Sequence, residues 1–264
     1  LTRSDTQNEF IDILFWMVDT TDSPLTGELM NFAAVSFRTA AVATIALAAA
    51  SVAQAQLTIP FGFTNSNSTQ TFTDDNLASF DLVNLTVSAA GNTTATGPVV
   101  VGESSGTQNS KSFAFPITKI VIGSKLNIAS GSAVGSALKF DRLDVDTGLA
   151  SGFTLANFTI DYDKKLVLAD VTPKGGVVAL QQPIYLFNVA TPLALKYKFP
   201  LTVTGNELLD QLMLSPSAKT LFKTALQLPE FAEPALDFEF GTLKQDISTT
   251  LRKTAISTKP YVAK

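Results

Sequence analysis

The strongest constraint on the fold of this chain is an alternation of apolar and polar residues with a period of two, which is typical of β-strands with one buried face. The clearest run is Phe158–Asp163. A turn-like Asp163-Lys164-Lys165 and a second run, Leu166–Val171, follow it, so we expect a hairpin here. Leu193–Val203 alternates over a longer stretch. Pro200 removes one donor from its ladder, which predicts an edge position or a bend.

Turn signals rich in Gly, Pro and Asn separate further segments that we expect to be strands. These segments are Leu57–Phe63, Phe80–Val87, Phe113–Ile122, Ala137–Val145, Val177–Val189 and Leu236–Phe240. Two polar stretches, Thr64–Asn76 and Gly102–Ser110, are expected to be surface loops. Short strands with regular turns predict a mainly β protein, either an antiparallel β-sandwich or a related β-rich fold.

One region, near residues 206–228, changes from a period of two to a helical period. Ser215 and Pro216 have the residue types of an N-cap and a first helical position. The apolar residues after them recur at helical spacing: Ala218, Leu221, Phe222, Ala225 and Leu226. Leu208, Leu209, Leu212 and Met213 predict a shorter helix before them. We expect this small helical insert to cover an end or an edge of the sheet.

Residues 30–55 contain the three parts of a cleavable signal peptide. Arg38 supplies the basic part, Thr39–Val52 the apolar part, and Ala53-Gln54-Ala55 the small residues at the cleavage site. Cleavage would leave Gln56 as the first residue of the mature chain. The apolar run is short for a transmembrane helix of about 20 residues. A buried Ala-rich helix and a signal anchor are the alternatives.

Residues 1–29 do not fit a signal peptide, because they are acidic and begin with Leu1. We expect them to be a disordered leader from upstream translation, with synthesis starting at Met30. The mature protein would then be a single β-rich domain, residues 56–264. Of the 19 basic and 23 acidic residues in the chain, two basic and six acidic ones precede Gln56, so the mature part is balanced in charge. This balance argues against a nucleic-acid partner, which needs a basic surface.

The chain contains neither His nor Cys. This composition excludes a Ser-His-Asp triad, a Cys-His dyad and disulfide bonds, and it makes structural zinc, haem and iron–sulfur sites unexpected. Acid–base chemistry would have to come from carboxylates, Lys or Tyr. We therefore expect no organic cofactor.

One acidic cluster has the residue types of a metal site. Asp141, Asp144 and Asp146, with Gly148 close behind, could supply oxygen ligands to calcium. The spacing does not match an EF-hand loop, and a solvated acidic strand end is the alternative. Asp161 and Asp163 form a second, weaker cluster.

These observations favour an exported protein, periplasmic, cell-surface or secreted, with a non-catalytic binding, adhesion or envelope-structural role. Its partner would be an unknown ligand or an envelope or extracellular component, and an exposed edge strand could support oligomers. No stable membrane span is expected after signal cleavage. A secreted hydrolase or lyase that uses carboxylates alone is the first alternative. An outer-membrane β-barrel is the second.

Overall fold

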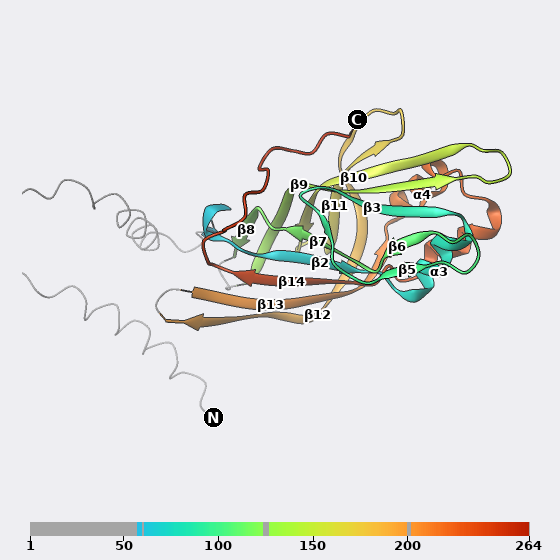
Figure 1. Ribbon diagram of the computed structural model, residues 1–264. Coiled ribbons are helices and arrows are strands. Elements are labelled where there is room, and N and C mark those ends of the chain that lie inside the picture. Colours follow the sequence, from blue (N-terminus) through green and yellow to red (C-terminus); the bar gives the residue numbers. More distant parts are fainter. Residues whose placement is uncertain (1–56, 60, 124–126, 200–201, 264) are drawn as a thin grey trace, which may run out of the picture. The chain divides into compact units, whose positions relative to one another are not determined.

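The computed structural model describes residues 57–59, 61–123, 127–199 and 202–263, which all belong to one compact unit (Figure 1). The predicted leader, the signal segment and the cleavage residues Ala53, Ala55 and Gln56 lie outside the described residues. No described helix is long and apolar enough to cross a membrane.

A 12-stranded antiparallel sheet makes up most of the described chain. Its strands are β1 (Leu57–Ile59), β2 (Asn67–Thr71), β3 (Leu85–Gly91), β4 (Thr94–Ala95), β7 (Ser112–Pro116), β8 (Lys119–Ile122), β9 (Ile128–Leu143), β10 (Ala150–Asp161), β11 (Leu166–Pro173), β12 (Ala179–Lys198), β13 (Thr202–Leu214) and β14 (Thr242–Ser248). Their order in the sheet is β1-β8-β9-β10-β11-β12-β13-β14-β2-β7-β4, and β3 pairs with β9. A separate two-stranded sheet contains β5 (Val99–Val101) and β6 (Gln108–Ser110).

The predicted class, mainly β and antiparallel, is confirmed, and the main sheet is one continuous curled surface. The hairpin predicted after Phe158 is present as β10 and β11, in which Ile160 pairs with Val167 and Asp161 with Leu166. The curl brings strands that are distant in the sheet order to opposite sides of a common interior, which is filled mainly by aromatic and aliphatic side chains.

Helices lie at one end of this curled sheet. They are α3 (Asp74–Leu82), α4 (Pro216–Ala225) and the 3-10 helix η3 (Glu230–Asp237); a short 3-10 turn, η2 (Phe61–Phe63), follows β1. Figure 1 shows α3 and α4 at the same end, while the β12–β13 hairpin extends past the other strands at the opposite end. Phe222 of α4 packs edge-on against the stacked rings of Phe140 and Phe153, with ring centroids 5.3 and 4.8 Å away. α4 thereby closes the helical end of the core.

The N-terminal signals predicted for α4 are confirmed. Ser215 Oγ accepts a hydrogen bond from the N–H of Ala218 (3.1 Å), and Pro216 occupies the first helical position. The shorter helix predicted before α4 is wrong, because Leu208–Met213 belong to β13. Gln211 has a positive φ of 50°, and it interrupts the alternation so that Leu209 and Leu212 both point into the core. This irregularity in the strand imitates the i, i+3 spacing of a helix.

The expected strand at Phe80–Val87 is wrong in its first half, which is the end of α3. Thr73 caps this helix: its Oγ1 accepts from the N–H of Asn76 (3.1 Å), and the Asn76 side chain accepts from the N–H of Thr73. Thr followed three residues later by Asn forms a capping box, and these local hydrogen bonds favour a helix over the strand expected at this place.

Two further expectations for strands are wrong. Leu236–Phe240 is not a strand, since η3 extends to Asp237 and places Ala232 and Leu236 in the core. Leu193–Val203 is two strands, because β12 ends at Lys198, β13 begins at Thr202, and these two residues pair. The alternation continues through the hairpin, and Pro200 lies in the sequence between the strands.

The polar stretch Thr64–Asn76, expected to be a surface loop, contains the strand β2. β2 lies between β14 and β7, and its Ser68 and Gln70 side chains are buried. The sequence Asn-Ser-Thr-Gln-Thr has no apolar residue to mark it as a strand. Its inward-facing polar side chains form hydrogen bonds inside the sheet, as buried polar atoms in folded proteins generally do.

Candidate functional site

The candidate site is a hollow on the concave face of the curled sheet. Its cavity volume is about 40 Å3, which is room for a few water molecules, and the empty space measures about 500 Å3 when the opening to solvent is included. Its walls come from β2, β7, β13 and β14 on one side and from β9, β10, β11 and β12 on the other. The lining residues are Ser68, Gln70, Phe115, Ile117, Gly131, Ser132, Ala133, Phe158, Ile160, Val167, Tyr185, Leu212, Leu243 and Gln245. None of these described residues is charged.

A row of polar side chains crosses three neighbouring strands on this concave face. Glu207 of β13 is paired with Gln245 of β14, and Gln245 is paired with Ser68 of β2. All three residues are buried. Gln245 Nε2 donates a hydrogen bond to Ser68 Oγ (2.9 Å). Side chains paired across neighbouring strands share one face of a sheet, so these groups form a continuous polar stripe along one wall.

A second polar pair lies in the hollow beside this stripe. Gln70 Nε2 donates to the hydroxyl of Tyr185 at 3.2 Å. Burial raises the pKa of Tyr185 to about 12, so the phenol stays protonated at neutral pH. Tyr185 therefore presents a neutral hydroxyl to the cavity, in a wall that is otherwise mostly apolar.

Tyr162 and Glu207 connect opposite walls of the curled sheet. Tyr162 follows β10, and its hydroxyl donates to Glu207 Oε2 on β13. The Tyr162 ring also packs edge-on against Phe187 of β12, with centroids 5.8 Å apart. Burial raises the pKa of Glu207 above its ordinary value, while hydrogen bonds from Tyr162 and from the backbone of Leu193 act in the opposite direction. Burial and the neighbouring Glu207 raise the pKa of Tyr162 well above its usual range.

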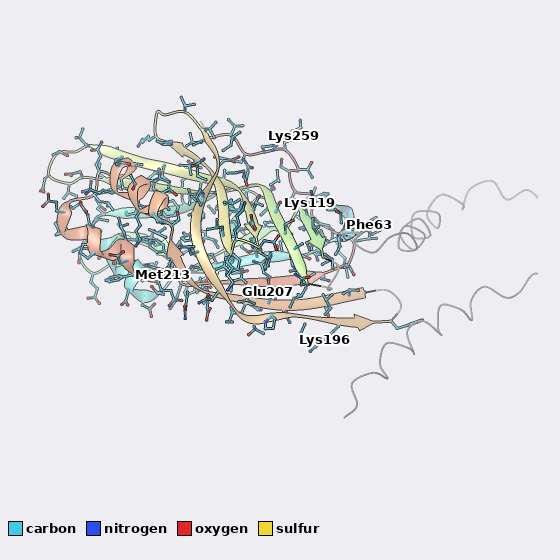
Figure 2. The ribbon with its side chains drawn as sticks, turned by 180° about the vertical axis from the view of Figure 1, so that it is seen from behind. Phe63, Lys119, Lys196, Glu207, Met213 and Lys259 are labelled. Carbon is cyan, nitrogen blue, oxygen red and sulfur yellow. The ribbon has the colours of Figure 1, made fainter. Side chains whose placement is uncertain are left out.

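Figure 2 shows where Glu207 lies along the molecule. Glu207 lies between the helical end, where Met213 is labelled, and the tip of the β12–β13 hairpin, where Lys196 is labelled. On β13, Glu207 lies between Asn206, which pairs with Ala194, and Leu208, which pairs with Thr191. The Tyr162–Glu207 bond therefore joins the two walls beyond Leu186, where the pairing of β12 with β11 ends.

The predicted calcium residues lie at a hairpin turn outside the hollow. Asp144 accepts hydrogen bonds from the N–H groups of Thr147 (3.0 Å) and Asp146 (3.1 Å), and it pairs with Arg142 (3.2 Å). These bonds, those from Thr147 first, lower the pKa of Asp144. Asp141 and Asp146 are exposed.

Among the described residues, no group of three or more acidic, His or Cys side chains could hold a metal ion. Asp144 instead stabilises its own turn and orients Arg142. Calcium binding by Asp141, Asp144 and Asp146 stays a prediction, and this geometry adds no support to it.

The second acidic cluster is also at a turn. Asp161 Oδ1 accepts from the N–H of Lys164 (3.0 Å), and Asp161 pairs with the Lys164 ammonium at 3.4 Å. Asp163 is exposed in the same turn. Neither residue lines the hollow, so the geometry does not favour the carboxylate-only enzyme that these clusters suggested.

None of the polar residues that line the hollow was predicted as a site residue from the sequence. A signal is nevertheless present in β14, where Leu243, Gln245 and Ile247 occupy alternate, buried positions. A glutamine in phase with two buried aliphatic residues points into the core. Glu207, in phase with Leu209, carries the same signal on β13.

Comparisons with known proteins do not identify a family for this chain. No family model matches the chain, and no curated protein is similar to it in sequence. A solved structure that resembles it is the C-terminal domain of HtaA from Corynebacterium glutamicum, at 14% identity and a TM-score of 0.42, covering 70% of this chain and 97% of that domain. A likeness this distant carries no argument about function, which therefore rests on the residues of the hollow.

Proposed function

We propose that this chain is an exported, non-catalytic binding protein whose ligand occupies the hollow of the curled sheet. The observation that carries the proposal is the lining of the hollow: an apolar wall with five neutral polar side chains, Ser68, Gln70, Ser132, Tyr185 and Gln245. A concave, mainly apolar cavity with a few converging polar groups is the usual form of a small-molecule site.

The chemistry of the lining favours binding over catalysis. General acid–base catalysis needs groups whose pKa lies near the working pH. The polar groups of the lining are hydroxyls and carboxamides, and the Tyr185 phenol remains protonated at neutral pH. These groups can orient a ligand by hydrogen bonds. Export is proposed on the signal-like segment at residues 30–55 alone.

The test compares ligand binding by the native protein with binding by a variant in which a larger side chain fills the hollow. The full chain would be expressed, recovered from the exported fraction and labelled with 15N, and hexan-1-ol would be titrated while the side-chain amide signals of Gln70 and Gln245 are recorded. Hexan-1-ol is a suitable probe because an alkyl chain is narrow and its hydroxyl can bond to the polar stripe.

Ala133→Leu is the variant that fills the cavity, because Ala133 is buried in the lining. Ala150→Leu is the matched control, because Ala150 is an exposed residue of β10 outside the lining. We expect hexan-1-ol to shift both amide signals in the native protein and in Ala150→Leu, and to leave them unchanged in Ala133→Leu. Equal shifts in all three proteins would contradict binding in the hollow.

The predicted assembly through an edge strand finds a candidate edge in β12. Its pairing with β11 ends at Leu186, and in the described chain the following residues pair only with β13. Val189 and Leu195 are partly exposed there. Pro192 and Lys196 lie in the same stretch, and both residue types discourage edge-to-edge association. Assembly stays a prediction that gel filtration of the exported protein tests.

A further inference from the structure

We propose that the hollow selects a small, uncharged ligand, such as an aliphatic alcohol, carbonyl compound or primary amide, and excludes carboxylates and amines of the same length. This inference rests on the proposed function and adds the chemical class of the ligand. It follows from the hydrogen-bonding capacity of the wall and from the absence of charge among the described lining residues.

The polar groups of the wall retain hydrogen-bonding capacity toward the cavity. Gln245 donates to Ser68, and Gln70 donates to Tyr185. Among the described residues, no acceptor receives the hydroxyl protons of Ser68 and Tyr185, and no donor reaches the carboxamide oxygens of Gln70 and Gln245. The wall thus offers two donors and two acceptors, which match a hydroxyl, a carbonyl or a neutral amide.

An anionic head group would be unpaired in this hollow. No Lys or Arg is among the described lining residues. A carboxylate would have to leave water without a cation to receive it, and an unpaired buried charge is strongly disfavoured. Glu207, which neighbours Gln245 on the concave face, adds repulsion whenever it is ionised.

A cationic head group would also lose its hydration without a free counter-ion. Glu207 is the acidic residue on this face, and its carboxyl group is already engaged by the Tyr162 hydroxyl. Binding an ammonium group to Glu207 would compete with this bond between opposite walls. The side chains of the described lining residues supply only neutral carboxamide and hydroxyl oxygens to a cation.

The size of the hollow limits how much of a ligand it encloses. Its cavity volume, about 40 Å3, is much smaller than the cavity of about 150 Å3 that accommodates benzene in an engineered protein. A ligand of the size of hexan-1-ol therefore also occupies the open part of the hollow, which measures about 500 Å3 with its opening. Phe115, Phe158 and Leu212 supply apolar contacts for its alkyl chain.

The experiment compares hexan-1-ol, hexanoate and hexylammonium at pH 7.5, which have the same chain and differ in head-group charge. Each would be titrated into the 15N-labelled full chain, with the side-chain amides of Gln70 and Gln245 as the readout. We expect hexan-1-ol to bind at least about tenfold more tightly than either ion. Hexanoate or hexylammonium binding as tightly as the alcohol would overturn the inference and leave the hollow as the binding site.

Two variants keep this test independent of folding. Tyr185→Phe keeps the ring and removes one donor, and it should weaken hexan-1-ol binding without improving hexanoate binding. Ala133→Leu should abolish the shifts from all three compounds. If none of the compounds shifts the amides of the native protein, the proposed function fails together with the inference.

Discussion

Replacing Asp81 with Asn should destabilise the protein strongly, although this changes only one side-chain atom and one charge. Asp81 is a buried residue of α3, and its carboxylate accepts hydrogen bonds from the loop before β6. The donors are the N–H groups of Ser104 (2.6 Å), Ser105 (3.0 Å) and Thr107 (3.3 Å) and the hydroxyls of Ser105 (2.6 Å) and Thr107 (2.9 Å). Four of these bonds reach Oδ1, and the Ser104 bond reaches Oδ2.

The size of the effect follows from this arrangement. In Asp81→Asn the carboxamide oxygen can replace Oδ1, but the NH2 group then faces the N–H of Ser104. One buried donor loses its acceptor, at about 1–3 kcal/mol, and the remaining bonds lose their charge assistance. We expect a loss of about 2–4 kcal/mol in the free energy of unfolding. Gly102 of the same loop packs closely against this carboxylate, since a Cβ placed on it would lie 1.9 Å from Asp81 Oδ1.

The same contact predicts a pH dependence. Burial alone would raise the pKa of Asp81, but the bonds from Ser105, Ser104 and Thr107 outweigh it and hold the pKa well below its ordinary value of 3.8. Because the folded-state pKa is depressed, the stabilisation is fully present above pH 3.8 and is lost as the pH falls toward the folded pKa.

Urea unfolding followed by circular dichroism at pH 7 and pH 3 measures both effects. Asp75→Asn is the matched control, because Asp75 is an exposed residue of the same helix. The difference between the native protein and Asp81→Asn should be smaller at pH 3 than at pH 7. A change of less than about 1 kcal/mol at pH 7, or one equal to that of the control, would refute this reasoning.

Three other changes have definite expected results. Arg142→Lys should lower the free energy of unfolding by about 2–3 kcal/mol, because Arg142 donates to the carbonyl of Val83 (3.1 Å) after α3 and to those of Leu226 (3.2 Å) and Gln227 (3.0 Å) at the end of α4. Amide hydrogen exchange in α4 should rise, and unchanged exchange would argue against this role. Tyr185→Phe should change the free energy of unfolding by at most about 1–2 kcal/mol, since one neutral hydrogen bond is lost. Calorimetric titration should show weaker binding of hexan-1-ol to this variant. An unchanged affinity for hexan-1-ol would show that Tyr185 does not belong to the site. Glu207→Gln should stabilise the protein more at pH 8 than at pH 4.5, because the raised pKa of Glu207 means that ionisation of its carboxyl group destabilises the fold as the pH rises. Urea midpoints of the native protein and of Glu207→Gln across this pH range measure the difference in stability. A difference that shrinks with rising pH would contradict the prediction.

The sequence predicted those elements whose local signals agree with their final environment. The β10–β11 hairpin alternates cleanly, and α4 begins at a strong N-cap, Ser215, followed by Pro216. In both cases the apolar residues face the core and the polar residues face outward, so the periodicity of the sequence predicts the element that burial stabilises.

The elements that were missed are those in which the interior is polar or the alternation is interrupted. β2 has no apolar residue, and its place in the sheet depends on Gln245 and Tyr185, which are distant in sequence. The positive φ at Gln211 shifts β13 by one residue and imitates a helix. The polar side chains of the lining come from β2, β9, β12 and β14, so no local pattern in the sequence could predict that they meet.

The most direct test of the proposed site is a crystal structure of the exported protein with hexan-1-ol. We expect density for the alkyl chain among Phe115, Phe158 and Leu212, with the hydroxyl within hydrogen-bond distance of Tyr185, Gln70 or Gln245. Density for water alone in the hollow of a crystal grown at saturating hexan-1-ol, or for the alcohol only elsewhere on the molecule, would contradict it.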